Sequence, residues 1–191
     1  MQNQSKKTAL LVMDLQNGIV PHLGENIEEA IIPYQKAVKA AREHALPVIF
    51  IRVGFSEGYP EISPKNKAFS AILSKYGAMT VHDKATQIHE SIQPEGNEPV
   101  ITKYRVSAFC GSNLEVILRA QQIETLILSG IATSGVVLST LREAADKDFE
   151  IKVLEDACFD SDPEVHRVLM EKVFPRQADV LTVQSWIATL N

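Results

Sequence analysis

Short runs of apolar residues recur along the chain and alternate with segments whose apolar positions have helical spacing. From these runs we predict strands at residues 8–13, 47–53, 99–102, 125–129, 149–154 and 179–183. The runs are continuous and do not alternate between apolar and polar residues, which is typical of strands that are buried on both faces of a parallel sheet.

Helices are predicted between the strands. Apolar residues at positions 27, 31, 34, 38 and 41 are spaced by four and three, which gives a helix one apolar stripe. Further helices are predicted at 112–119, where Ser112 and Glu115 match a capping box, at 136–147, and from 161 onward. This alternation predicts an α/β fold: a doubly wound, mostly parallel six-stranded sheet with helices on both faces, in a Rossmann-like arrangement.

Charged residues follow two of the predicted strands. Asp14 comes directly after the first strand and Lys103 after the third, and in such folds ligands bind at the carboxyl ends of the strands. Taken alone, either residue is an ordinary turn cap or a solvated strand end. Together they predict an ion pair in a cleft, where each changes the proton affinity of the other. The segment 54–68 breaks the pattern and is predicted to be a loop that covers the cleft.

The composition fits one folded domain over residues 1–191. Hydrophobic residues make up 45% of the chain and charged residues 23%. The net charge of −5, with no basic stripe, argues against nucleic acid and membrane surfaces as partners. The apolar runs are too short to span a bilayer, and no signal peptide is evident. Two cysteines do not make a disulfide framework, so we expect a cytoplasmic protein.

Three segments, in chain order, resemble the isochorismatase-like superfamily. Residues 11–17 (LVMDLQN) resemble the strand that ends in its catalytic aspartate, and residues 103–109 (KYRVSAF) resemble its lysine segment. Residues 130–137 (GIATSGVV) resemble its nucleophile segment, which usually reads Gly-Val-Ala-Thr-Asp-x-Cys-Val. The resemblance covers nearly the whole chain and implies that Asp14 and Lys103 are catalytic. It also implies a non-proline cis peptide between Ile131 and Ala132.

Val136 stands where the resemblance places the nucleophilic cysteine. In the family, a thiolate at the start of a helix attacks a carbonyl carbon, and a valine has no group that can do so. The isochorismatases of this superfamily also work without that cysteine: their aspartate hydrolyses a vinyl ether by acid catalysis, and they carry glycine at this position. Cys110 and Cys158 are the two thiols of the chain, and we expect both to be structural.

We therefore expect a hydrolase that acts on a small polar or carboxylated substrate through an Asp14/Lys103 acid–base dyad, without a cysteine nucleophile. The alternative is a catalytically silent relative that binds a small molecule or serves as an assembly subunit. The retained dyad favours the enzyme, and Val136 favours the silent relative.

Candidate substrate-binding residues come from the aromatic positions and from the three segments. Arg105 is a candidate to bind a carboxylate through two hydrogen bonds, with a structural ion pair as its alternative role. Each aromatic residue has packing in the core as its alternative. The expected set is Phe55, Tyr59, Tyr104, Arg105, Thr133, Gly135 and Val136, with Phe69 as a further aromatic candidate.

We expect no metal and no cofactor. Nicotinamidases of the superfamily bind a metal through an Asp-x-His pair after the second strand, and residues 52–55 (RVGF) contain neither residue type. The five histidines do not have ligand spacing. The resemblance and the prevalence of two-fold symmetry predict a homodimer or a higher homo-oligomer.

Overall fold

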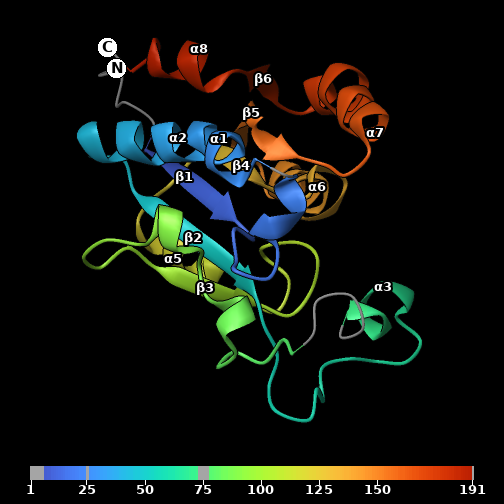
Figure 1. Cartoon of the computed structure of the whole chain (residues 1–191). Coiled ribbons are helices and arrows are strands. Elements are labelled where there is room, and N and C mark those ends of the chain that lie inside the picture. The colour runs from blue at the N-terminus through green and yellow to red at the C-terminus, as the bar shows by residue number, and fades with distance from the viewer. Residues whose placement is uncertain (1–6, 25, 73–77, 191) are drawn as a thin grey trace.

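The structure is a computed structural model that describes residues 7–24, 26–72 and 78–190 (Figure 1). Its centre is one six-stranded sheet in the order β3-β2-β1-β4-β5-β6, and every neighbouring pair is parallel. The predicted doubly wound α/β fold is confirmed. The strands are β1 (Thr8–Met13), β2 (Val48–Val53), β3 (Val100–Lys103), β4 (Thr125–Ile131), β5 (Glu150–Phe159) and β6 (Asp179–Leu181).

Strand β5 is longer than predicted. The apolar run ends at Leu154, but the strand continues to Phe159 because its pairing with β4 shifts register between Leu128 and Gly130 and then resumes. Cys158 pairs with Gly130 beyond this irregularity. The irregularity carries β5 to the carboxyl edge of the sheet, where its last residue reaches the functional site.

Helices and short helical turns connect the strands. The α-helices are α1 (Ile27–Ala30), α2 (Ile32–Glu43), α3 (Lys67–Ser70), α5 (Leu114–Ala120), α6 (Leu138–Asp146), α7 (Pro163–Val168) and α8 (Val183–Ile187). The other turns are η1 (Val20–Leu23), η2 (Lys84–Thr86), η3 (Glu90–Ile92), η4 (Thr133–Val137), η5 (Leu169–Val173) and η6 (Phe174–Arg176).

The predicted capping box before α5 is wrong. The Oγ atom of Ser112 accepts a hydrogen bond from the amide of Leu114 at 3.1 Å and donates one to the carbonyl of Ala108 at 2.6 Å. Asn113 is the N-cap residue and has no side-chain capping bond. Glu115 does not reach back to the helix start but forms an ion pair at 2.7 Å with Lys147, the residue that caps the end of α6.

The sheet has an apolar layer on each face because successive side chains of a strand point to opposite sides. Leu10 and Val12 of β1 lie in the cluster that α2 and α8 cover, and Leu11 and Met13 lie in the cluster that α5 and α6 cover (Figure 1). This two-sided burial explains the continuous apolar runs in the sequence. Within the described residues, no helix has the length and apolar character that crossing a membrane requires.

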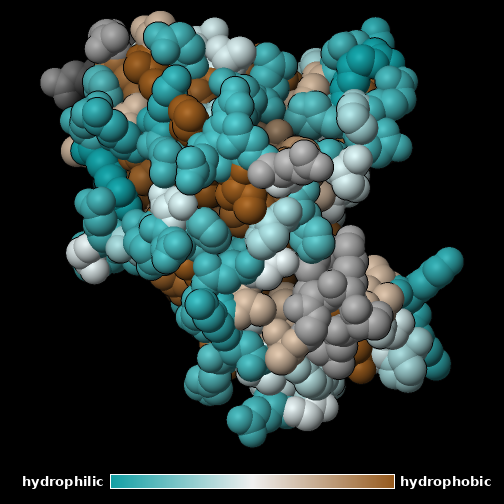
Figure 2. Space-filling model, in the orientation of Figure 1, coloured by the Kyte–Doolittle hydropathy of each residue, from teal (hydrophilic) through white to brown (hydrophobic). Residues whose placement is uncertain are grey.

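The strand order reverses between β1 and β4, which is where folds of this type bind ligands. Gly130 makes the close approach of these two strands possible, since a Cβ atom there would lie 2.6 Å from the carbonyl oxygen of Met13. Beyond β2 the chain runs away from the sheet to α3 (Figure 1). The surface is hollowed between the parts that carry α7 and α3 (Figure 2).

Candidate functional site

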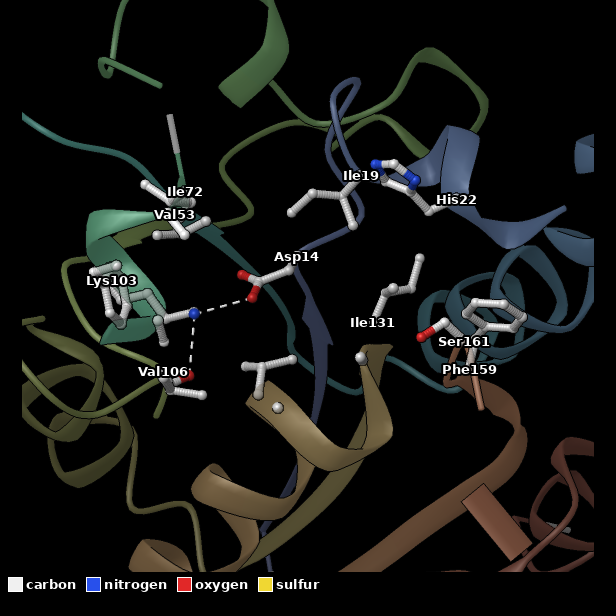
Figure 3. Close-up of a pocket in the computed structure, with 16 residues that line it drawn as sticks. Asp14, Ile19, His22, Val53, Ile72, Lys103, Val106, Ile131, Phe159 and Ser161 are labelled. Carbon is white, nitrogen blue, oxygen red and sulfur yellow. Dashed lines mark hydrogen bonds and ion pairs between the residues drawn. The ribbon is translucent and has the colours of Figure 1, made fainter. Parts of the chain in front are cut away.

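A pocket of about 550 Å³ lies at the carboxyl edge of the sheet (Figure 3). Five strands contribute to it at their carboxyl ends: β2, β3, β4 and β5 through their last residues, and β1 through the residue that follows it. The described lining residues are Asp14, Ile19, His22, Val53, Ala68, Phe69, Ala71, Ile72, Lys103, Val106, Ile131, Ala132, Gly135, Val136, Phe159 and Ser161.

Asp14 and Lys103 form an ion pair on the pocket wall. The Nζ atom of Lys103 lies 2.9 Å from Oδ2 of Asp14, and the two residues are 2% and 5% exposed respectively (Figure 3). The same ammonium donates hydrogen bonds to the carbonyl oxygens of Arg105 and Val106, both at 3.0 Å. An ammonium group has three N–H donors, so all three donors of Lys103 are engaged.

The second carboxylate oxygen of Asp14, Oδ1, is buried and has no hydrogen-bond partner in the described structure. Burial raises the pKa of Asp14, and the charge of Lys103 and its hydrogen bond oppose that rise without cancelling it. The carboxyl group therefore retains a proton at a higher pH than an ordinary aspartate. Its protonated form is a hydrogen-bond and proton donor.

The backbone holds Asp14 in this position. Its φ is 61°, a left-handed conformation that aspartate tolerates better than most residues, and its amide donates to the carbonyl of Ile51 on β2 at 2.9 Å. The amide of Gln16 donates back to the carbonyl of Asp14 at 2.9 Å. The chain thus turns sharply out of β1 with the carboxyl group at the edge of the sheet.

Gln16 is a supporting residue that the sequence did not single out. Its side chain is fully buried, and its Oε1 accepts a hydrogen bond from the amide of Val53 at 2.9 Å. Its Nε2 donates to the carbonyls of Val53 at 2.8 Å and Thr86 at 2.9 Å. The side chain therefore joins the end of β1 to the end of β2. The sequence carried little signal for this role, because Gln16 lies in the polar segment that follows β1, between Asp14 and Asn17.

The turn after β4 brings Gly135 and Val136 to the pocket, together with Ile131 and Ala132. The peptide between Ile131 and Ala132 is cis, as the resemblance implied. Gly135 interrupts the helical backbone with φ −98° and ψ −105°, and α6 follows this turn. The structure thus places the side chain of Val136 in the same pocket as Asp14 and Lys103.

Phe55 and Tyr59 were expected to bind the substrate, but the structure places neither on the pocket lining. Phe55 is fully buried behind Phe69, with the two rings edge-on at a centroid distance of 5.8 Å. The hydroxyl of Tyr59 accepts a hydrogen bond from the amide of Met79 at 3.2 Å, which fixes the loop. Phe69 of α3 lies on the described pocket lining.

Tyr104, Arg105 and Thr133 also lie outside the lining. Arg105 donates from Nη1 to the carbonyl of Tyr104 at 2.6 Å, and its guanidinium group lies 5.8 Å from the ring centroid of Phe69. Tyr104 packs against the larger core cluster. The hydroxyl of Thr133 pairs with Nδ1 of His166 at 2.8 Å, on the side of α7. Five of the seven expected substrate-binding residues are therefore engaged elsewhere, and Gly135 and Val136 remain.

Neither cysteine lies on the pocket lining of the described structure. Cys158 is buried in the core on β5, and burial raises the pKa of its thiol far above the ordinary value. Cys110 is exposed in the segment between β3 and α5. Because the thiolate is the reactive form, neither residue is arranged as a nucleophile for this pocket.

Within residues 7–24, 26–72 and 78–190, no group of three His, Cys, Asp or Glu side chains is arranged to hold a metal ion.

Comparison with known proteins gives a consistent result. The family model of the isochorismatase domain matches residues 8–185. The uncharacterized isochorismatase family protein YecD of Escherichia coli O157:H7 is 30% identical, with both chains covered completely. The ureidoacrylate amidohydrolase of Acinetobacter baylyi is 29% identical over all of this chain and 86% of its own. An isochorismatase family protein of Burkholderia thailandensis has a similar structure, with a TM-score of 0.85 and 26% identity over 96% of this chain and 95% of its own.

Proposed function

The chain belongs to the isochorismatase family, and we propose that it is a hydrolase of a small molecule in which Asp14 is the proton donor and acceptor and Lys103 stabilises the ionised form of Asp14. No thiol takes part in this reaction, because Val136 lines the pocket where the family resemblance expects the nucleophile.

One observation carries the proposal: among the described residues, a buried carboxyl oxygen of Asp14 has no hydrogen-bond partner, and the pKa of the group is raised. A buried carboxyl group with an unoccupied oxygen can donate its proton to a substrate atom. General acid–base catalysis of this kind contributes about 10²- to 10⁴-fold to the rate.

The reaction consumes one water molecule. Protonated Asp14 transfers its proton to the substrate, either to the leaving-group atom or to the carbon of an enol ether double bond. Water adds to the carbon that becomes electron-deficient and releases a proton, which restores the Asp14 carboxyl group. A leaving group that Asp14 protonates departs with that proton as its bond breaks. For an enol ether, the hydroxyl group that water supplies gives its remaining proton to the ether oxygen as the C–O bond breaks, and a carbonyl compound and an alcohol form.

Lys103 acts through Asp14 in this mechanism. Its three donors are engaged by Asp14 and by the carbonyls of Arg105 and Val106, so its charge stabilises the carboxylate that remains after proton transfer. A direct role, in which the lysine stabilises negative charge on the substrate, would need a free N–H donor on Lys103. The geometry supports the indirect role.

A panel of amides, carbamoyl compounds and vinyl ethers tests the proposal. We expect turnover of at least one class by the wild type and its loss in Asp14→Asn. Turnover that survives in Asp14→Asn would overturn the assignment of Asp14.

A silent small-molecule-binding protein is the second candidate, and the valine at position 136 is the observation that favours it. Binding of panel compounds without turnover of any of them would establish this second function in place of the first.

A further inference from the structure

The pocket lining is mostly apolar. Of the sixteen described lining residues, twelve are apolar or glycine, and the four others are Asp14, Lys103, His22 and Ser161. The cavity of about 550 Å³ has the size of a site for a small organic molecule. Most of the surface of a bound molecule would therefore contact hydrocarbon.

Among the described lining residues, no cation is positioned to bind a substrate carboxylate next to Asp14. The donors of Lys103 are engaged by three oxygen atoms of the protein. Arg105 lies outside the lining, against the ring of Phe69. A substrate carboxylate beside Asp14 would also place two negative groups together in a buried site, which disfavours ionisation of both.

The exposed polar residues lie away from Lys103. Figure 3 shows Ser161 beside Phe159 and His22 near Ile19, both away from the ammonium of Lys103. Ile131 lies between Asp14 and Phe159 in the same view. Among the described lining residues, the buried polar atom without a partner is Oδ1 of Asp14, and apolar side chains line the pocket from there toward Phe159.

We propose that this pocket takes an uncharged, mostly apolar substrate of one or two rings, whose single polar group hydrogen-bonds to Asp14 and whose rings pack against Ile131 and Phe159. This inference rests on the proposed function and narrows it. It replaces the polar or carboxylated substrate that the sequence predicted, because Arg105, the expected carboxylate ligand, is not in the lining.

Isothermal titration calorimetry with matched pairs of compounds tests the inference. Phenylacetamide is compared with phenylacetate, and naphthalene-2-carboxamide with naphthalene-2-carboxylate, at pH 7.5 on the full chain. Within each pair the shape is nearly constant and the charge differs. We expect each amide to bind at least tenfold more tightly than its carboxylate.

Substitutions at Phe159 test where in the pocket the compounds bind. Phe159→Ala should weaken binding of the naphthalene amide about tenfold, and Phe159→Leu should restore most of the loss. Val116→Ala is the matched control, because Val116 is 70% exposed on α5 and does not line the pocket. Carboxylates that bind as tightly as the amides, amides that do not bind at millimolar concentration, or an unchanged affinity in Phe159→Ala would each overturn the inference.

The results of these experiments distinguish a failure of this inference from a failure of the proposed function. Tight binding of the neutral amides with no turnover of any panel compound would sustain the inference and overturn the hydrolase. Asp14-dependent turnover of a carboxylated compound that also binds more tightly than its amide would sustain the hydrolase and overturn the inference.

Discussion

The ammonium of Lys103 lies 2.9 Å from one carboxylate oxygen of Asp14, while the other oxygen of the same carboxyl group has no hydrogen-bond partner in the described structure. The pair is therefore asymmetric: the ammonium of Lys103 holds one oxygen, and the other is the atom that we propose contacts the substrate. A buried ion pair stabilises a fold weakly, but removal of one partner is costly. This makes the pair sensitive to single substitutions.

Asp14→Asn should lower kcat by about 10²-fold or more, because the substitution removes the proton that the carboxyl group donates. The measurement is turnover of whichever panel compound the wild type hydrolyses, with circular dichroism to verify folding. Asp179→Asn, on the exposed end of β6, is the matched control and should retain wild-type activity. A kcat of Asp14→Asn within twofold of the wild type would contradict the role of Asp14.

Lys103→Met should lower the free energy of unfolding by about 3 kcal/mol near neutral pH, because it leaves the Asp14 carboxylate buried without a counter-ion. Burial raises the folded-state pKa of Asp14 above its usual 3.8, and Lys103 opposes that rise, so the variant raises it further. The stability that a raised pKa provides is complete below the unfolded pKa and is lost as pH rises through the folded one. The deficit of the variant should therefore be small near pH 4 and should increase toward neutral pH.

Urea denaturation of wild type and variant at several pH values measures this deficit. Lys152→Met on β5 is the control, since Lys152 is outside the pocket lining. A deficit in Lys103→Met that is constant with pH would show that Asp14 does not titrate in the way described.

The sheet was predictable because its strands are buried on two faces, which requires continuous apolar runs such as residues 8–13 and 125–129. The pairing of Asp14 with Lys103 was also predictable, because both residues follow such runs and the carboxyl ends of parallel strands lie at one edge of the sheet. The extension of β5 was not, because it follows an irregularity in register and includes the charged pair Glu155 and Asp156.

The substrate-binding residues were hard to predict because side-chain direction in a loop does not follow from residue type. Phe55 and Phe69 are chemically identical, yet one is buried behind the other, and the second faces the pocket. Arg105 carries the charge that suits a carboxylate, but its guanidinium group stacks on Phe69 and donates to the neighbouring carbonyl. Sequence alone does not separate these arrangements.

Iodoacetamide should modify Cys110 and leave Cys158 unmodified in the native protein. Cys110 is exposed, whereas Cys158 is buried and its thiol pKa is raised. Intact mass spectrometry should give one adduct per native chain and two after denaturation in urea. Hydrolytic activity should survive the modification, because neither thiol lines the pocket. Loss of activity in parallel with the single adduct would assign a catalytic thiol to Cys110.

The protein should be a homodimer or a larger homo-oligomer in solution. Two-fold symmetric assembly is the commonest arrangement of soluble oligomers, and it is also what the family resemblance implies. Multi-angle light scattering at micromolar concentration should give at least twice the chain mass of 21.1 kDa. A particle of the single-chain mass would contradict this expectation.

Gln16→Leu should reduce both stability and activity, because the glutamine side chain joins the strand ends that carry the pocket. The substitution leaves the amide and carbonyl of Val53 and the carbonyl of Thr86 without their side-chain partner in a buried site. Each unsatisfied buried group costs about 1–3 kcal/mol, and partial relaxation reduces the sum, so we expect a loss of roughly 2–4 kcal/mol.

The loss of activity in Gln16→Leu is expected because of the way β2 pairs with β3. Val53 lines the pocket and pairs directly with Lys103 in the β2–β3 ladder, so movement of Val53 displaces the ammonium that stabilises ionised Asp14. We therefore expect kcat to fall about tenfold at a temperature where the variant is still folded, since small misplacements at a site have large kinetic effects. Gln121→Leu, at the exposed end of α5, should change stability by no more than about 0.5 kcal/mol. If Gln16→Leu were less stable but had wild-type kcat, Gln16 would support the fold without positioning the dyad.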